Sequence, residues 1–253
     1  MIIKNILITG ASSGIGEALA LYYAQQQETE NLYICGRNQQ RLNKVKKACQ
    51  KVGKAKIHAR IIDITNKEDV EKWINATEKS TPLNLVFANA GVATLEESPE
   101  NIYNTFNTNV MGVINTITPA IENYKKRADK SKIIAITASI AGYHGLPACP
   151  SYSATKACVK TYGEALRLNL LSYNIQVNTI CPGFVRSRIT DKNTCPMPFF
   201  MEADKAAEII AKRIQKNIGL IAFPWPMRLA VWLGSILPNR ISDLIYKRLP
   251  YKV

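Results

Sequence analysis

Residues 6–16 of this chain read ILITGASSGIG. The first four are apolar or β-branched and predict a buried strand, and the residues that follow the glycines have helical spacing. Gly10 would allow the tight turn between strand and helix, Gly14 a close approach of backbone to a pyrophosphate, and Gly16 close packing of helix on sheet, although G-x-x-x-G-x-G replaces the common G-x-G-x-x-G. Because a helix N-terminus attracts phosphate, the stretch favours a dinucleotide site. A flexible turn is the alternative interpretation.

The rest of the chain alternates short apolar runs with longer segments of helical spacing. The runs predict strands at residues 2–9, 32–35, 56–62, 83–88, 132–137, 176–180 and 220–223. The longer segments predict helices at residues 14–27, 39–52, 67–80, 99–124, 151–172 and 202–217, and Pro119 is expected to kink or end the fourth. This alternation is typical of α/β proteins. It predicts a Rossmann-like, doubly wound parallel sheet of seven strands with helices on both faces, followed by a helical C-terminal tail.

The domain organisation follows from length and continuity. The chain has 253 residues and no repeat or linker, so residues 1–223 are expected to form one nucleotide-binding domain and residues 224–253 an amphipathic extension. The longest apolar run of the extension, residues 229–237, is too short to span a bilayer, which takes about 20 residues. Its basic amphipathic pattern with tryptophans also fits a membrane interface. We favour packing over the substrate pocket or against a partner subunit, because most amphipathic helices bury their apolar stripe against protein.

Composition excludes several classes of protein. With 47% hydrophobic and 21% charged residues the chain is globular, and its net charge of +14 directs attention to acidic partners: nucleic acid, an anionic membrane, a phosphorylated cofactor or an acidic protein. The lysines lie on different predicted helices without interleaved aromatic residues, so a nucleic-acid binder is not favoured.

The cysteine pattern and the N-terminal sequence bear on metal binding and on the cellular location of the protein. Six cysteines and two histidines show no zinc-ligand spacing, so no metal site is predicted. Cys35, Cys158 and Cys181 lie in apolar runs and are expected to be reduced core thiols. The N-terminus carries no signal-peptide pattern, and the location is expected to be cytoplasmic.

The end of the second predicted strand indicates which cofactor is bound. Cys35 is followed by Gly36 and Arg37, a position that faces the adenosine ribose in dinucleotide-binding folds. A carboxylate there favours a free 2′-hydroxyl, whereas arginine favours a 2′-phosphate, so NADP(H) is expected over NAD(H). A solvated arginine at a helix start is the alternative.

A second pattern carries proton chemistry. Tyr152 and Lys156 are four residues apart at the start of a predicted helix, so they share a face. A nearby ammonium is expected to lower the pKa of the phenol from about 10 into a useful range. By itself the pair is more simply explained as an exposed helix pair.

Several ordered motifs together overturn that explanation. They are Thr9 to Gly16, Asp63 after the third strand, Asn89-Ala90-Gly91 after the fourth, Asn109 with Gly112, Ser139 after the fifth, the Tyr152-Ser153-Ala154-Thr155-Lys156 segment and Pro182-Gly183 after the sixth. In these motifs residues 1–223 resemble the compact short-chain dehydrogenase/reductase family.

The resemblance implies roles for individual residues. Tyr152 would give a proton to a substrate carbonyl oxygen, Ser139 would hydrogen-bond that oxygen, and Lys156 would lower the phenol pKa and bind the nicotinamide ribose. Asn109 would hold a water that links Lys156 to solvent. The expected catalytic residues are Asn109, Ser139, Tyr152 and Lys156. The expected cofactor-binding residues are Thr9, Gly10, Ser12, Ser13, Gly14, Ile15, Gly16, Arg37, Asp63, Asn89, Ala90, Gly91, Tyr152, Lys156, Pro182, Gly183 and Val185.

These residues predict an NADP(H)-dependent oxidoreductase that reduces a carbonyl or oxidises the matching secondary alcohol. Residues 186–201, where the family carries a substrate lid, combine basic and apolar side chains, which suits a hydrophobic or acyl substrate such as a 3-oxoacyl thioester. The resemblance also implies a homodimer or homotetramer built through the helices at 99–124 and 151–172. A nonenzymatic NADP-binding regulator is the alternative, but it would be favoured only by loss of Tyr152, Lys156 or Ser139. A sugar-nucleotide epimerase would need a larger substrate domain than the chain provides.

Overall fold

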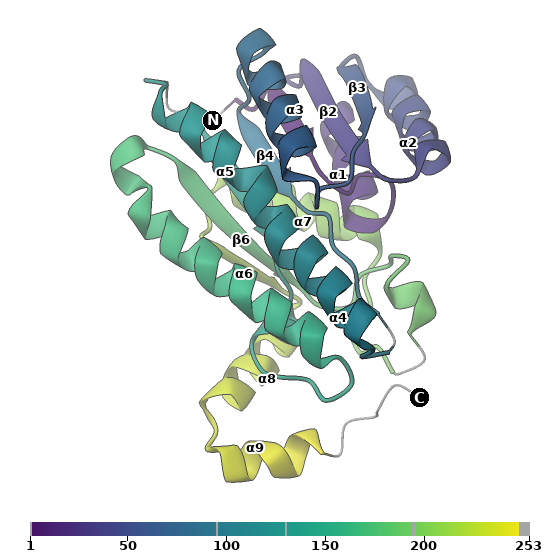
Figure 1. The fold of residues 1–253 in the computed structure, drawn as a ribbon, viewed down its shortest axis with the longest axis vertical. Helices are drawn as coiled ribbons and strands as arrows, with labels where there is room; N and C mark the ends of the chain where they lie inside the picture. Colours follow the sequence, from purple (N-terminus) through teal and green to yellow (C-terminus); the bar gives the residue numbers. More distant parts are fainter. Residues whose placement is uncertain (1, 95, 130, 194–195, 248–253) are drawn as a thin grey trace.

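The computed structural model describes residues 2–94, 96–129, 131–193 and 196–247. Cys195, part of the expected lid and residues 248–253 of the tail lie outside this range. Seven strands form one sheet in the order β3-β2-β1-β4-β5-β6-β7, and every neighbouring pair is parallel. The predicted fold class is confirmed (Figure 1). Because the chain winds outward in both directions from β1 and β4, the carboxyl ends of these two strands mark the crevice where such sheets bind ligands.

The strands lie close to their predicted positions. They are β1 (Asn5–Ile8), β2 (Asn31–Gly36), β3 (Lys56–Ile61), β4 (Leu85–Ala88), β5 (Ile133–Thr137), β6 (Gln176–Pro182) and β7 (Leu220–Phe223). The central strands β4 and β5 are buried along their whole length, as expected for a parallel sheet covered on both faces.

Helices cover both faces of the sheet. They are α1 (Gly14–Ala24), α2 (Gln39–Val52), α3 (Lys67–Ser80), α4 (Pro99–Phe106), α5 (Gly112–Lys125), α6 (Pro150–Asn169), α7 (Ala203–Gln215), α8 (Trp225–Ile236) and α9 (Asn239–Tyr246). Helices α1, α2 and α7 pack on one face, and α3, α5 and α6 on the other (Figure 1).

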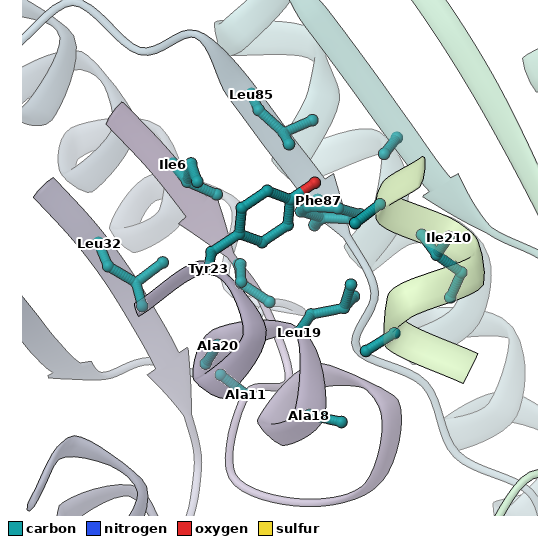
Figure 2. Packing of buried hydrophobic residues seen from close by; sticks show 14 of the residues in the cluster. Ile6, Ala11, Ala18, Leu19, Ala20, Tyr23, Leu32, Leu85, Phe87 and Ile210 are labelled. Carbon is teal, nitrogen blue, oxygen red and sulfur yellow. The ribbon is translucent and has the colours of Figure 1, made fainter. Parts of the chain in front are cut away.

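Figure 2 shows the core on the α1 face. Tyr23 of α1 lies between Ile6 and Leu32 of the sheet and the ring of Phe87, whose centroid is 5.9 Å from its own. Ile210 of α7 closes this cluster from the other side. The packing fixes α1, which follows directly from the glycine turn, on this face of the sheet.

The helix predicted at residues 99–124 differs from expectation. It is divided by a π-helical turn, η1 (Asn107–Met111), and α5 then continues past Pro119 to Lys125. Of the two outcomes expected at Pro119, a kink or an end, the helix end is wrong, because the proline is buried with Ile117, Ala120 and Ile121, whose packing holds the helix together. The irregular turn lies instead at Asn109, and such turns are frequent at functional sites.

The expectation of a buried thiol at Cys158 is also wrong. Cys35 and Cys181 are buried on the sheet, whereas Cys158 is exposed. On α6 the buried positions are residues such as Thr155, Lys156 and Val159, and position 158 falls on the opposite side of the turn.

The C-terminal extension forms the helices α8 and α9, which lie beyond one end of the sheet (Figure 1). Met227 and Val231 of α8 are partly buried and pack against the core cluster of the α6 face. The side of α8 that carries Trp225 and Trp232 is exposed. Within the described ranges, no helix combines the length and apolar character needed to cross a membrane.

Candidate active site

A pocket of about 370 Å³ opens at the carboxyl ends of the strands. Its volume falls in the range of small-molecule and cofactor sites. The predicted site residues that line it are Gly10, Ser12, Ser13, Gly14, Ile15, Gly16, Arg37, Asp63, Asn89, Ala90, Gly91, Ser139, Tyr152, Lys156, Pro182, Gly183 and Val185. Thr9 and Asn109 are not among the lining residues and lie buried behind the wall.

The glycine turn has a backbone conformation that residues other than glycine rarely adopt. Gly10 and Gly14 have φ angles of 68° and 60°, in the left-handed region. A Cβ on Gly16 would stand 2.4 Å from the carbonyl oxygen of Gly10, so this glycine lets α1 begin directly against the turn. The N-terminus of α1, whose first amides lack partners within the helix, therefore lies at the pocket wall.

Thr9 supports this wall from behind. Its hydroxyl donates to the carbonyl of Phe87 at 3.1 Å and accepts from the amide of Asn89 at 3.0 Å. The Asn89 side chain donates to the carbonyl of Thr9 at 3.1 Å and accepts from the Thr137 hydroxyl at 3.3 Å. These bonds tie the ends of β1, β4 and β5 together, so Thr9 and Asn89 position the floor of the pocket.

Two arginines lie at the other end of the pocket, where β2 ends. A Cβ on Gly36 would stand 3.0 Å from the Ser12 hydroxyl, so the backbone of β2 comes close to the glycine turn. Arg37 is 3.7 Å from the Asp63 carboxylate. Arg41, one turn into α2, also lines the pocket, and its Nε is buried without a hydrogen-bond partner among the described residues. An unpaired buried guanidinium donor is suited to a ligand anion.

The expected catalytic side chains meet at the ends of β5 and β6. Ser139, two residues after the end of β5, has its hydroxyl 3.5 Å from the carbonyl of Pro182 and accepts from the amide of Ala141 at 3.1 Å. Tyr152 forms a hydrogen bond with the Ser139 side chain. The Lys156 ammonium lies 5.6 Å from the centroid of the Tyr152 ring and donates to the carbonyl of Thr137 at 2.9 Å. A proton donor, a second hydrogen-bond donor and a cation thus converge on one point.

The pKa values of this group follow from burial. Burial raises the pKa of Tyr152 to about 12, although the hydrogen bond with Ser139 acts in the opposite direction. Burial lowers the pKa of Lys156 to about 8. The direction at Tyr152 is opposite to the one expected from the Tyr152/Lys156 spacing. The reason is that removing the phenolate of Tyr152 from water destabilises it more than the hydrogen bond with Ser139 stabilises it. The Lys156 ammonium donates to the carbonyl of Thr137 and does not offset this cost.

Asn109 connects the π turn to the site. It is fully buried, its Oδ1 accepts from the amide of Val92 at 2.8 Å, and its Nδ2 donates to the carbonyl of Val92 at 2.9 Å and to the Thr155 hydroxyl at 3.1 Å. A Cβ on Gly91 would meet both Asn109 Oδ1, at 3.1 Å, and Lys156 Nζ, at 3.3 Å. Asn109 therefore lies beside Lys156 and joins the end of β4 to α6.

Helix α6 receives its N-terminal cap from a distant residue. Cys149, the residue before the helix, makes no side-chain cap, and Pro150 has no amide hydrogen. Glu97 supplies an acceptor instead: its Oε1 receives the amide of Ser151 at 3.1 Å and the Ser151 hydroxyl at 2.8 Å. The loop after β4 is thus fastened to the helix turn that carries Tyr152.

The two ends of the segment after β6 are joined by backbone pairing. Met201 pairs with Val185, and its amide and carbonyl bond to Phe184 and Arg186 at 2.9 Å each. Between them, Ser187, Arg188, Ile189 and Thr190 line the pocket, whereas Phe199 is exposed. A Cβ on Gly14 would stand 2.9 Å from Cβ of Ser187, which places this segment against the glycine turn.

Sequence reasoning missed Arg41 and Glu97. Arg41 stands four residues after Arg37, and this spacing could have indicated a shared face on one side of the pocket. Glu97 carries no such signal, because its partner Ser151 is 54 residues away. Among the described residues, no group of three His, Cys, Asp or Glu side chains could hold a metal ion.

Comparisons with known proteins agree with this geometry. A family model described as short chain dehydrogenase matches residues 4–196. An uncharacterized oxidoreductase of Myxococcus xanthus is 32% identical over 97% of this chain and 97% of its own length. The 11-beta-hydroxysteroid dehydrogenase-like 4A of Arabidopsis thaliana is 29% identical over 93% of this chain and 81% of its own length. A solved short-chain dehydrogenase from Sphingobium yanoikuyae in complex with NADPH has a TM-score of 0.79 at 21% identity, covering 97% of this chain and 94% of that one, and supports the fold.

Proposed function

Since the chain belongs to the short-chain dehydrogenase/reductase family, whose enzymes are oxidoreductases of CH–OH and C=O groups, we propose that it is an NADP(H)-dependent reductase of a carbonyl substrate. The reverse reaction oxidises the matching secondary alcohol. The observation that carries this proposal is the convergence of Ser139, Tyr152 and Lys156 at the end of a pocket that also contains the glycine turn. When bound, the nicotinamide supplies the hydride for reduction and accepts it in the reverse direction.

The side chains of the site supply the proton and stabilise the charges that form during the reaction. Tyr152 donates its phenolic proton to the carbonyl oxygen as the hydride arrives at the carbon, so the product is a neutral alcohol. Ser139, already hydrogen-bonded to Tyr152, donates to the same oxygen and stabilises its developing charge. Lys156 stabilises the phenolate that remains and binds the nicotinamide ribose. Asn109, beside Lys156, holds a water through which the proton is replaced from solvent.

The residues at the adenosine end fit NADP(H). The phosphates would rest on the backbone of residues 10–16, and Asp63 would contact the adenine. Arg37 and Arg41 supply two guanidinium groups where a 2′-phosphate would lie, and the unpaired Nε of Arg41 supports this preference.

Replacing Arg41 by glutamine tests the cofactor preference. The Kd for NADPH is expected to rise about tenfold or more, because a charged hydrogen bond is lost, whereas the Kd for NADH changes less than about twofold. Fluorescence titration measures both constants. Lys44→Gln, which removes a cation from the exposed side of the next turn of α2, is the control. Equal loss of affinity for the two cofactors would contradict the assignment of Arg41 to the 2′-phosphate.

The substrate is proposed to be hydrophobic with an anionic group, such as a 3-oxoacyl thioester. The support is the segment after β6, in which Ile189 and Arg188 line the pocket and the Arg186 guanidinium lies 5.1 Å from the centroid of the Phe200 ring. Ketosteroids are the second class to test, because the Arabidopsis relative has a hydroxysteroid dehydrogenase name.

The reaction is tested by following NADPH oxidation over a panel of 3-oxoacyl thioesters, ketosteroids, quinones and simple ketones. Turnover of the best substrate is expected to fall about 10²-fold or more in Tyr152→Phe, because the general acid is lost, while NADPH still binds. Tyr162→Phe, an exposed tyrosine on the same helix, is expected to leave turnover unchanged. If NADPH binds and neither the wild type nor Tyr152→Phe turns over any carbonyl, the regulator alternative replaces the enzyme.

A homodimer or homotetramer and a cytoplasmic location stay predictions. Exposed apolar side chains support the expected subunit contact along the helices at 99–124 and 151–172. They are Tyr103, Phe106, Met111, Tyr162 and Leu168.

A further inference from the structure

The exposed face of α8 is an apolar stripe with regular helical spacing. Its members follow one another by four, three, one and three residues, which places them on one side of the helix. They are Trp225, Leu229, Trp232, Leu233 and Ile236. Trp225 is 73% exposed and Ile236 60% exposed, and no residue of α8 is buried.

Among the residues that the structure describes, none covers the stripe, although the opposite side of α8 is packed. Met227 and Val231 pack against the core cluster on the α6 face of the sheet, and a Cβ on Gly183 would stand 3.0 Å from Met227 Sδ. Helix α8 is therefore fixed to the body of the protein by one face and presents the other outward. Helix α9 adds three exposed apolar residues, Ile241, Leu244 and Ile245. Contiguous exposed apolar surface of this kind marks an interaction site.

The charges beside the stripe indicate what covers it. Arg228, Arg240 and Lys247 lie on α8, on α9 and directly after α9, and Asp243 is the acidic residue between Pro224 and Lys247. Tryptophan with arginine or lysine is the composition of helices that lie in a bilayer interface, where the indole occupies the headgroup level and the cations meet anionic lipid. A second copy of the chain would bring the same cations, on molecules of net charge +14, against one another.

We propose that α8 and α9 form a peripheral binding surface for an anionic lipid bilayer, with the stripe of α8 buried at the headgroup boundary. Because Met227 in the first turn of α8 lies against Gly183, which lines the reacting end of the pocket, this end of the molecule faces the lipid. Figure 1 shows α8 and α9 beyond the end of the sheet, where a flat surface can reach them. The inference stands apart from the proposed reaction, because its test measures binding and not turnover.

Sedimentation with vesicles tests the proposal on the full chain. Wild-type protein is expected to bind vesicles of phosphatidylcholine with phosphatidylglycerol, more weakly at high salt and more weakly still to phosphatidylcholine alone. The variant Trp232→Gln/Leu233→Gln is expected to lower the partition coefficient about tenfold or more, since two large apolar groups no longer enter the interface.

A matched control removes exposed apolar side chains from another surface. Val52→Gln/Ile61→Gln changes α2 and β3, which lie in the stretch 31–62 that carries lysine and arginine but no acidic residue. This variant is expected to bind vesicles within about twofold of wild type. An equal loss in both variants would show that binding depends on exposed apolar side chains in general and not on the stripe, and would overturn the proposal.

Tryptophan fluorescence gives a second measurement. Trp73 is buried, whereas Trp225 and Trp232 are exposed, so a blue shift on adding vesicles reports the stripe. The proposal is overturned if wild-type protein neither sediments with anionic vesicles at low salt nor shifts its emission. It is also overturned if sedimentation velocity without lipid shows that the stripe variant halves the mass of an oligomer while vesicles are not bound.

Discussion

At the residue scale, the buried ammonium of Lys156 controls the pH range of the proposed reduction. Its pKa of about 8 lies far below that of Tyr152, about 12, so Tyr152 stays protonated while Lys156 loses its charge as the pH rises through about 8. The kcat/KM for carbonyl reduction is therefore expected to fall above about pH 8. A pH profile on the best substrate measures this, and a rate independent of pH between about 7 and 9 would contradict it.

The same residue carries a stability cost with a definite sign. Below about pH 8 Lys156 is protonated in both the folded and the unfolded protein, and the folded protein bears the full penalty of a buried charge. Between about 8 and 10.5 the unfolded chain binds more protons, so this penalty is relieved as the pH rises. Lys156→Met is expected to melt at a higher temperature than wild type near pH 7, with the difference shrinking toward pH 10.

At the scale of the element, the start of α6 depends on Glu97. Because Oε1 of Glu97 is the acceptor for the Ser151 amide, Glu97→Ala is expected to lower the free energy of unfolding by about 1 kcal/mol. It is also expected to lower kcat more than it changes the Kd for NADPH, since the freed turn carries Tyr152. Glu96→Ala, which removes the neighbouring exposed carboxylate, is the control for both urea unfolding and kinetics. An unchanged midpoint and kcat in Glu97→Ala would show that the cap does not matter.

Strands, helices and turns that depend on residues adjacent in the sequence were predictable. The apolar runs located all seven strands, and the glycine turn located the pocket, because both depend on residues adjacent in the chain. The π turn at Asn109 was not predictable, since its cause lies in hydrogen bonds to Val92 and Thr155. Pro119 misled for a related reason: its burial, with that of Ile117, Ala120 and Ile121 on the same helix, appears only in the assembled core and outweighs the local preference of proline.

At the scale of the whole molecule, the sequence predicted which residues meet but not which surfaces remain uncovered. Amphipathic spacing in residues 224–253 predicted helices, and α8 and α9 confirm them within the described range. Spacing alone did not indicate which side of α8 would be packed and which exposed. The side with Met227 packs because the folded protein places Gly183 against it, whereas the side with Trp232 meets no such surface among the described residues. For the same reason, the unpaired donor of Arg41 became visible only with the pocket formed around it.

The short pairing of Val185 with Met201 has a consequence for how such an enzyme diversifies. The two ends of the intervening loop are joined to each other by backbone hydrogen bonds, which do not depend on side-chain identity. The part of the loop after Thr190 can therefore change in length or sequence while the sheet keeps its geometry, whereas residues 187–190 line the pocket beside the glycine turn and are expected to be retained. New substrate specificities can arise by exchanging loop residues between Thr190 and Met201, with the rest of the chain unchanged.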